Sequence, residues 1–422
     1  MKSKHYKLFF ALVLIHIFGY FNSANAQCTS RYLDTTFTAI DSFTNVVYTT
    51  TAGGSSNTQV MDIYQPSGDT ACLRHLILWA HGGAFFQGTK NDGDMEFFTH
   101  RFAQRGYVCA SINYRLASSI VLLYDSAQIF KYTIQAVSDF KAAIRYFYKD
   151  AQNGNRWNID TNAIFIAGNS AGAIAADFIA LLDSLNELAP AYQSIVTSNG
   201  GIDGNSGNDG YSTKVNAYAS LAGAIISTDW IKPGAPPMVL CQGTADQTVP
   251  YNCGQALTQY TGGLFPTINM CGSGQMAPAL DSVHANYSFL PFPGSAHVPW
   301  DTNVVIANRT DSAVAAFFYS INCVQAPGHC NEPLGINNIS EAAQILIYPN
   351  PATDRIQISV QDQSNISDVT LSDCTGREIS HSDINSKQTT LSVKGLAPGI
   401  YLLHLSLTNS GDQSVTRKII IE

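Results

Sequence analysis

The sequence predicts an α/β fold, in which a mostly parallel sheet has helices on both faces, followed by a small all-β sandwich. From Leu73 onward, short apolar runs alternate with segments of helical periodicity, as they do in a parallel sheet packed between helices. After Ser320 that pattern ends, and beyond residue 343 apolar and polar residues alternate as in antiparallel strands. The 422 residues also exceed the usual size of one domain, about 100–200 residues.

Short apolar runs predict six strands in the main domain: His75 to Ala80, Tyr107 to Asn113, Ala163 to Ala167, Ala217 to Leu221, Met238 to Cys241 and Tyr287 to Pro291. The clearest helix has an apolar stripe of residues spaced three or four apart: Phe130, Ile134, Val137, Phe140, Ile144 and Phe147. We expect this stripe to face the sheet. The opposite face carries Lys131, Asp139 and Arg145.

A linker is predicted over residues 324–343, because this segment contains Pro327, Gly328, Pro333 and Gly335 and lacks periodicity. We therefore expect a main domain over 27–323 and a β-sandwich over 344–422. Its strands are predicted from alternating runs at Ile356 to Val360, Val369 to Leu371, Leu391 to Val393, Ile400 to Leu405 and Ile419 to Ile421.

The first 26 residues predict a signal peptide. Three lysines precede an uncharged apolar run from Leu8 to Phe21, and the small-residue tripeptide Ala24-Asn25-Ala26 follows it. The apolar run is shorter than the roughly 20 residues that a spanning helix needs, so we expect no permanent membrane anchor. The mature protein is expected to be secreted or held at the cell surface.

Composition narrows the classes of partner. Apolar residues make up 45% of the chain and charged residues 13%, which fits a folded globular protein. The formal net charge of −8 makes nucleic acid and anionic membranes poor partners.

Export places the nine cysteines in a compartment where disulfides persist. Proximity in the sequence favours Cys323 with Cys330 and Cys253 with Cys271, then Cys28 with Cys72; Cys109 and Cys241 fit buried free thiols, and Cys374 stands alone. None has the spacing of a zinc or redox site, and we expect no cofactor. The segment from Ser198 to Gly210 is rich in Gly, Asn, Asp and Ser and predicts a long loop, and a calcium site there stays an open alternative.

The pentapeptide Gly168-Asn169-Ser170-Ala171-Gly172 is the one G-x-S-x-G sequence in the chain. It follows a predicted strand and precedes a run of small residues that predicts a helix. A sharp strand-to-helix turn needs glycines to relieve crowding, and it exposes the serine hydroxyl beyond the sheet. The pattern predicts Ser170 as a nucleophile.

A glycine-rich loop follows the strand that ends at Ala80. Attack on an ester places negative charge on the carbonyl oxygen, which preorganised backbone amides stabilise. We assign this oxyanion hole to Gly83 and Ala84, with Gly82 as a further contributor, and to Ala171 after the nucleophile. His81 is interpreted as a structural residue that braces this loop.

A serine nucleophile needs a base, and the base needs an acid that fixes its tautomer. Asp246 follows the predicted strand Met238 to Cys241, at the edge where parallel sheets build their sites. His297 follows the predicted strand Tyr287 to Pro291. Asp281 and Asp301 are reserve candidates for the acid, and His284 is the rival base. His100 and His329 lie in the wrong order or outside the domain.

With these motifs in order, residues 73–318 resemble the esterase and lipase branch of the α/β-hydrolases, which have His-Gly-Gly oxyanion loops. The resemblance implies an acyl-enzyme mechanism with Ser170 as nucleophile, His297 as base and Asp246 as its orienting acid. Ala84 stands where many relatives have a third glycine. The tripeptide Asn113-Tyr114-Arg115 also looks like a family motif, and we interpret it as packing beneath the oxyanion loop.

The C-terminal region resembles the sorting domains of the type IX secretion route. The matching segments are Ile347 to Ala352, with its Tyr-Pro-Asn-Pro sequence, the turn Asp373 to Gly376, Gly395 to Leu402, and the end of the chain from Lys418. The resemblance implies that the secretion machinery is a partner. A carbohydrate-binding sandwich is the structural alternative.

Together these features predict a secreted carboxylesterase that acts on small or carbohydrate-linked esters. Two alternatives stay open: a serine peptidase of the prolyl oligopeptidase type, and a non-catalytic surface protein that uses the hydrolase fold as a binding scaffold.

Overall fold

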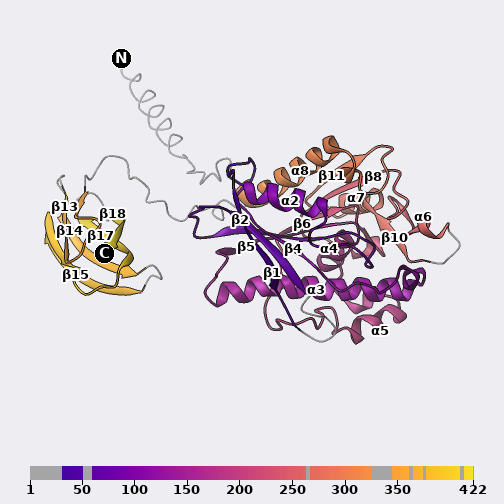
Figure 1. Cartoon of the computed structure of the whole chain (residues 1–422), viewed down its shortest axis with the longest axis horizontal. Helices are drawn as coiled ribbons and strands as arrows, with labels where there is room; N and C mark the ends of the chain where they lie inside the picture. The colour runs from indigo at the N-terminus through magenta and orange to yellow at the C-terminus, as the bar shows by residue number, and fades with distance from the viewer. Residues whose placement is uncertain are drawn as a thin grey trace, which may run out of the picture. The chain divides into compact units, whose positions relative to one another are not determined.

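The computed structural model describes residues 31–50, 59–262, 267–324, 345–360, 365–373, 377–408 and 413–421. The chain divides into two compact units, Met1–Pro333 and Leu334–Glu422 (Figure 1). The predicted signal peptide over 1–26 and all of the predicted linker except Val324 lie outside the described residues.

The first unit is built on an eight-stranded sheet in the order β1-β2-β4-β3-β5-β6-β8-β11. Its strands are β1 (Ile40–Val47), β2 (Val60–Pro66), β3 (Arg74–Ala80), β4 (Val108–Ile112), β5 (Ile159–Asn169), β6 (Ala217–Leu221), β8 (Met238–Gly243) and β11 (Tyr287–Phe292). Pairing is parallel from β4 to β11, whereas β1 and β2 are antiparallel additions at one edge. All six predicted strands belong to this sheet, and the fold class is confirmed; β1 and β2 were not predicted.

Helices cover both faces of the sheet, as Figure 1 shows. The helices are α2 (Gly93–Gln104), α3 (Ser126–Gln152), α4 (Ala171–Leu181), α5 (Pro190–Ser198), α6 (Thr258–Thr261), α7 (Ser273–Ser282) and α8 (Val304–Tyr319). Successive residues of β3 alternate between two apolar cores. Leu76 and Leu78 pack in the core that contains residues of α3 and α4, and Ile77 and Trp79 in the core that contains residues of α2 and α8. This period of two explains why a strand buried on both faces is continuously apolar.

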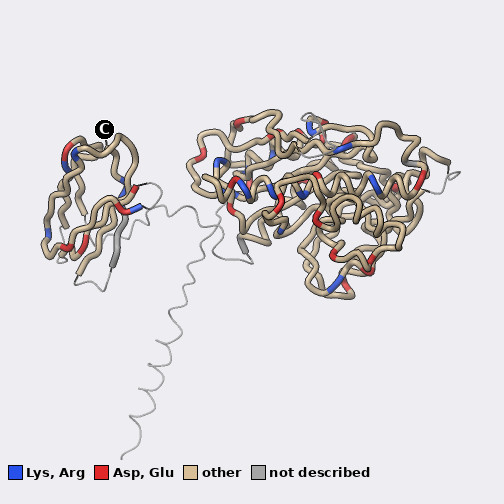
Figure 2. The backbone as a smooth tube through the Cα atoms, turned by 90° about the horizontal axis from the view of Figure 1, so that it is seen from below, with Lys and Arg blue, Asp and Glu red and all other residues tan. Residues whose placement is uncertain are grey.

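Short elements complete the unit. Single turns are η1 (Ile120–Tyr124), η2 (Leu185–Glu187), η3 (Thr228–Trp230), η4 (Pro299–Asp301) and the π-helical turn η5 (Ser320–Val324). A second sheet has the order β7-β10-β9, formed by β7 (Ala224–Ile225), β10 (Asn269–Gly272) and β9 (Cys253–Gln255). None of the helices in the described part of the chain is long and apolar enough to cross a membrane. Charged positions of both signs are sparse along the chain (Figure 2).

Helix α3 confirms the predicted apolar stripe, but its opposite face is covered rather than solvated. Asp139 is fully buried and Arg145 is 4% exposed. The Asp139 carboxylate pairs with Arg115 at 2.8 Å and accepts a hydrogen bond from Ser206 Oγ at 2.6 Å. Residues 198–210, which contain Ser206, form the cover. The helical periodicity alone did not reveal this cover, because polar residues on one face of a helix fit either a solvent-exposed face or a buried polar network.

The same loop uses its own oxygen atoms to bind α3. Lys141 Nζ donates to the carbonyl of Ile202 at 2.7 Å, and Arg145 donates to the carbonyl of Asp203 at 2.6 Å. Two backbone carbonyl oxygens of the loop are therefore hydrogen-bonded to cationic side chains of α3. This geometry favours a structural role for the loop.

The second unit is a β-sandwich of a three-stranded sheet, β12-β13-β16, and a four-stranded sheet, β15-β14-β17-β18. The strands are β12 (Ile345–Tyr348), β13 (Arg355–Val360), β14 (Asn365–Asp373), β15 (Glu378–Ser386), β16 (Gln388–Ser392), β17 (Gly399–Thr408) and β18 (Gln413–Ile421). Alternate residues Ile356 and Ile358 face Leu403 and Leu405 within one apolar core. Strand β15 was not predicted, because most of its residues are polar and exposed.

Candidate active site

Ser170 occupies the sharp turn between β5 and α4. Its φ and ψ are 53° and −115°, a conformation that costs an L-residue energy. The turn is held by a hydrogen bond from the Ser170 amide to the carbonyl of Leu221 at 2.8 Å. The turn also needs glycine on both sides of Ser170. A Cβ added to Gly172 would lie 2.0 Å from the carbonyl oxygen of Ala80, and a Cβ added to Gly168 would lie 2.2 Å from the carbonyl carbon of Gly172. Close backbone approach therefore explains both glycines of the motif.

The structure brings Ser170, His297 and Asp246 into one hydrogen-bonded chain. Ser170 Oγ lies 2.8 Å from His297 Nε2, and His297 Nδ1 lies 2.7 Å from Asp246 Oδ2. The three residues follow β5, β11 and β8, whose C-terminal ends meet at one edge of the parallel sheet. The Asp246 side chain is fully buried, and that of His297 is 15% exposed. The imidazole therefore reaches both a buried carboxylate and the exposed side of the site.

Asp246 is oriented by contacts that the sequence did not reveal. Its Oδ1 accepts hydrogen bonds from the amides of Thr248 and Val249, at 2.9 and 3.0 Å. Gln242, at the end of β8, is fully buried. Its Nε2 donates to Asp246 Oδ2 at 3.3 Å and to the carbonyl of Val249 at 3.0 Å, and its Oε1 accepts from the amide of Ser273. The one hint in the sequence is a polar residue, Gln242, at the end of an otherwise apolar strand, and it does not reveal these partners.

The glycine-rich loop lies against the nucleophile. A Cβ added at Gly82 would be 3.3 Å from Ser170 Cβ. Three consecutive residues, Gly83, Ala84 and Phe85, have φ values of 100°, 52° and 59°. The amides of Gly83, Ala84 and Ala171 make no hydrogen bond to any residue that the structure describes. The amide of Gly82, the further predicted contributor, likewise has no acceptor among the described residues, and Gly82, Gly83 and Ala84 line the same cleft as Ser170. Ala84 holds a conformation that glycine adopts more easily.

His81 and Tyr114 support this loop from below. The His81 ring is fully buried and stacks on Tyr114 with 4.3 Å between ring centroids. Its Nδ1 lies 2.7 Å from the carbonyl of Gly82, and Tyr114 Oη donates to the carbonyl of His81 at 2.7 Å. Burial lowers the pKa of His81 to about 4, so the ring is neutral. These contacts fit the bracing and packing roles expected for the two residues.

Two cavities meet at Ser170. The larger, about 950 Å³, is an open cleft lined by Ser170, His297, the glycine-rich loop and residues from α2, η1, α6 and η4. The smaller, about 30 Å³, is enclosed by mostly apolar side chains that include Ile174, Ile268 and Met270. A substrate bound at the hydroxyl therefore has a narrow apolar side and a wide side that is lined by both polar and apolar residues.

The reserve candidates lie elsewhere. Asp281 accepts a hydrogen bond from Tyr287 Oη at 2.7 Å, and Asp301 lines the large cleft without taking the place of Asp246 on the imidazole. His284 lies just after α7, and His100 packs edge-on against Tyr64. His329 lies outside the described residues.

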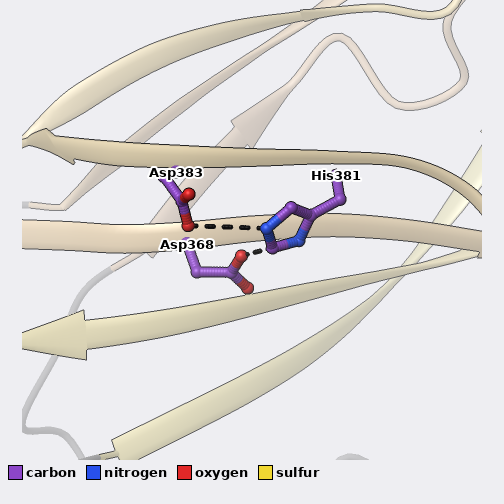
Figure 3. Close-up of side chains that lie close together, drawn as sticks. All are labelled: Asp368, His381 and Asp383. Carbon is purple, nitrogen blue, oxygen red and sulfur yellow. Dashed lines mark ion pairs between the residues drawn. The ribbon is translucent and has the colours of Figure 1, made fainter.

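One group of metal-ligating side chains is found in the described residues, and it belongs to the second unit: Asp368 on β14 with His381 and Asp383 on β15 (Figure 3). The two carboxylates contact different ring nitrogens. His381 Nδ1 lies 2.9 Å from Asp368 Oδ2, and Nε2 lies 3.4 Å from Asp383 Oδ1. One ion binds a single imidazole nitrogen, whereas these carboxylates contact both ring nitrogens, so we assign no metal to this group.

The cysteine predictions are tested in part. The disulfide Cys253–Cys271 is confirmed and joins β9 to β10. Cys109 and Cys241 are buried free thiols, as predicted. Cys72 is an exposed free cysteine, which does not support the predicted pairing with Cys28. Cys28, Cys330 and Cys374 lie outside the described residues, so the pairing of Cys323 with Cys330 stays a prediction.

Comparison with known proteins agrees with both units. Residues 61–202 match the BD-FAE family, and residues 346–422 match the family described as the secretion system C-terminal sorting domain. A search of curated proteins gave no match.

Among solved structures, the chain is similar to a thermophilic esterase of Thermogutta terrifontis with propionate bound (20% identity, TM-score 0.47, 66% of this chain and 93% of that one). The same esterase phosphorylated by paraoxon gives 19% identity and a TM-score of 0.47, over 68% of this chain and 96% of that one. The chain is also similar to a bifunctional GH43-CE protein of Bacteroides eggerthii, with 19% identity and a TM-score of 0.46, over 66% of this chain and 35% of that one. By its family matches and its sheet, the chain combines an α/β-hydrolase domain of the esterase type with a type IX C-terminal sorting domain.

Proposed function

We propose that the chain is a secreted serine carboxylesterase that forms an acyl-enzyme on Ser170. The observation that carries the proposal is the unbroken chain of contacts from Ser170 Oγ through His297 to Asp246, at 2.8 and 2.7 Å. A serine hydroxyl is a weak nucleophile unless a base takes its proton as it attacks, and here the base is already within hydrogen-bond distance.

In acylation, Ser170 Oγ attacks the ester carbonyl carbon while its proton moves to His297 Nε2. The imidazolium that forms keeps its Nδ1 proton on the Asp246 carboxylate. His297 then gives its Nε2 proton to the leaving alcohol oxygen, the carbon–oxygen bond of the ester breaks, and the acyl group stays on Ser170.

The negative charge on the attacked oxygen is stabilised by the amides of Gly83, Ala84 and Ala171. Their lack of other acceptors among the described residues supports this role. Each such donor is worth about 2.7–4 kcal/mol in related chemistry. In deacylation, His297 Nε2 takes a proton from water as the water oxygen attacks the acyl carbon. The bond between that carbon and Ser170 Oγ then breaks, the imidazolium returns its proton to Oγ, and the acid leaves.

The small apolar cavity favours short acyl groups. A volume of about 30 Å³ exceeds the roughly 10–15 Å³ that one water-sized sphere needs, but it does not hold a long chain. We propose that the acyl group lies there and that the alcohol lies in the large cleft.

The test uses p-nitrophenyl esters of acetate, butyrate and octanoate. We expect hydrolysis with the highest kcat/KM for acetate, and loss of at least about 10⁴-fold in Ser170→Ala. A fluorophosphonate probe should label the wild type and not the variant. An active Ser170→Ala protein would overturn the proposal, and faster cleavage of aminoacyl-proline amides than of esters would favour the peptidase alternative.

Export is the second part of the proposal. The predicted signal peptide over 1–26 would direct the chain across the inner membrane, and residues 344–422 would engage the type IX machinery; the family match over 346–422 supports this. In a host with that machinery, deleting 344–422 should hold esterase activity inside the cell. Unchanged export of the truncated chain would contradict it.

A further inference from the structure

The polar side of the large cleft carries excess negative charge. Three carboxylates line it, those of Asp92 and Asp94 near the start of α2 and that of Asp301 in η4. Among the described residues, no lysine or arginine lines this cleft. Of the described residues that line this cleft, His297 can carry a positive charge, and it does so only when its ring is protonated.

The hydrogen bonds in the cleft wall leave this charge largely uncompensated. Asp92 accepts hydrogen bonds from the amide and hydroxyl of Thr89, and Asp94 Oδ2 accepts one from Asn169 Nδ2 at 2.5 Å. Asp301 accepts none from the described residues. Asn169 also lines the cleft and is 4% exposed, and its Oδ1 is a buried acceptor that has no donor in the described part of the chain. The hydrogen-bond donors to Asp92 and Asp94 are neutral groups, so these bonds do not neutralise the negative charge of the wall.

The carboxylates also oppose each other's ionisation. Loss of hydration in the cleft and the nearby charge of Asp94 raise the pKa of Asp301 to about 6, although His297 acts in the opposite direction. Loss of hydration likewise raises the pKa of Asp94, against its hydrogen bond from Asn169. A positive charge bound between these groups would relieve the repulsion.

Aromatic rings line the same cleft. Phe86 follows the oxyanion loop, Tyr124 ends η1, and Tyr260 in α6 is 54% exposed. Aromatic faces attract cations, by about 0.5–1 kcal/mol at exposed sites and more where water is excluded. Carboxylates and rings around one cavity are the groups that bind an organic ammonium ion.

We propose that the alcohol side of the cleft selects esters whose leaving alcohol carries a positive charge, with Asp94 and Asp301 as the specificity-determining carboxylates. This inference rests on the proposed esterase function. A unit charge about 6 Å from one carboxylate, at an effective dielectric constant of about 40, gains enough for a preference on the order of 10-fold over a neutral isostere. An anionic alcohol would be disfavoured by a similar factor.

The test compares acetylcholine with 3,3-dimethylbutyl acetate, which has the same shape and no charge. Both give the same acetyl-enzyme, so the ratio of their kcat/KM values reports the alcohol side alone. We expect a ratio of roughly 10 at low salt, which falls as salt screens the charges. It should also fall below pH 6, as Asp301 gains a proton beside Asp92, Asp94 and His297.

Variants locate the effect. Asp301→Asn and Asp94→Asn should each lower the ratio several-fold, whereas Asp209→Asn should leave the ratio and the activity unchanged. Asp209 is 76% exposed, does not line the cleft, and its substitution changes the net charge equally. A ratio near one, or an equal ratio in Asp301→Asn and the wild type, would overturn this inference. A protein that hydrolyses none of the three esters, including p-nitrophenyl acetate, would instead count against the esterase function.

Discussion

The carboxylate of Asp246 lies 2.7 Å from Nδ1 of His297, and its other oxygen accepts two backbone hydrogen bonds, from Thr248 and Val249. These backbone hydrogen bonds orient the Asp246 carboxylate independently of its contact with His297. In the mechanism that we propose, this carboxylate holds the imidazole with Nδ1 protonated, and the lone pair of Nε2 then accepts the Ser170 proton.

The first prediction concerns this orienting carboxylate. Asp246→Asn should reduce kcat for p-nitrophenyl acetate by about 10³–10⁴-fold, because the amide stabilises the wrong imidazole tautomer. Asp281→Asn is the control, since that carboxylate bonds Tyr287 and should leave kcat within about two-fold. Similar losses in the two variants would contradict the assignment.

A second prediction concerns Gln242. Gln242→Met keeps the volume but leaves the amide of Ser273 and the carbonyl of Val249 without their buried partner, at about 1–3 kcal/mol each. We expect a lower midpoint of urea unfolding and a fall in kcat. The same substitution at Gln255, a partly exposed residue of β9, should change neither, and equal effects at the two positions would remove any special role for Gln242.

The third prediction concerns pH and stability. Burial raises the pKa of Asp177 from 3.8 to about 8, against a hydrogen bond from Ser220 Oγ at 2.9 Å. A raised folded-state pKa contributes stability that is complete below pH 3.8 and is lost as pH rises through about 8. Each pH unit in that window costs about 1.4 kcal/mol.

Asp177→Asn cannot ionise, so the wild type should lose stability relative to this variant between pH 5 and pH 8. Urea unfolding of both proteins at several pH values measures the difference, and groups common to both cancel. A difference that stays constant with pH would show that the buried carboxyl does not titrate in this window.

A fourth prediction concerns the elbow. Gly172→Ala would place a Cβ 2.0 Å from Ala80 O, so the turn must move, and we expect unfolding at a lower temperature together with loss of esterase activity. Gly93→Ala meets no atom within 4 Å and should keep its melting temperature within a few degrees. Thermal unfolding followed by circular dichroism compares the melting temperatures of the two variants. A Gly172→Ala protein that is stable and active would refute the packing argument.

The fifth prediction concerns acyl length. Met270 lines the small cavity, so Met270→Ala should widen it and raise kcat/KM for butyrate or hexanoate relative to acetate by roughly 10-fold. Met238→Ala is the matched control variant, because Met238 is also buried but does not line that cavity. Both should lose about 2–5 kcal/mol of stability, and only the first should change the acyl preference. An equal change in both would mean that the cavity does not hold the acyl group.

Much of the fold was predictable because its signals are local. In β3, the stretch from Leu76 to Ala80 is buried on both faces and continuously apolar, and the sharp turn at Ser170 has small neighbours. Both features are visible in a few consecutive residues. Strands β1 and β15 were not predicted, because exposed strands carry no such signal. The burial of the polar face of α3 was not predicted, because the cover comes from residues 198–210, far away in the sequence.

The sequence by itself determined the order of the chemical groups and the place of each beside a strand end, because chain order and periodicity are properties of the linear chain. Only the tertiary structure decided that Asp246, and neither Asp281 nor Asp301, contacts His297, because that choice depends on distances between residues about 50 positions apart. The same holds for Gln242, for the two cavities and for the carboxylates of the cleft. Contacts of this kind arise when distant segments pack together, and no local pattern encodes them.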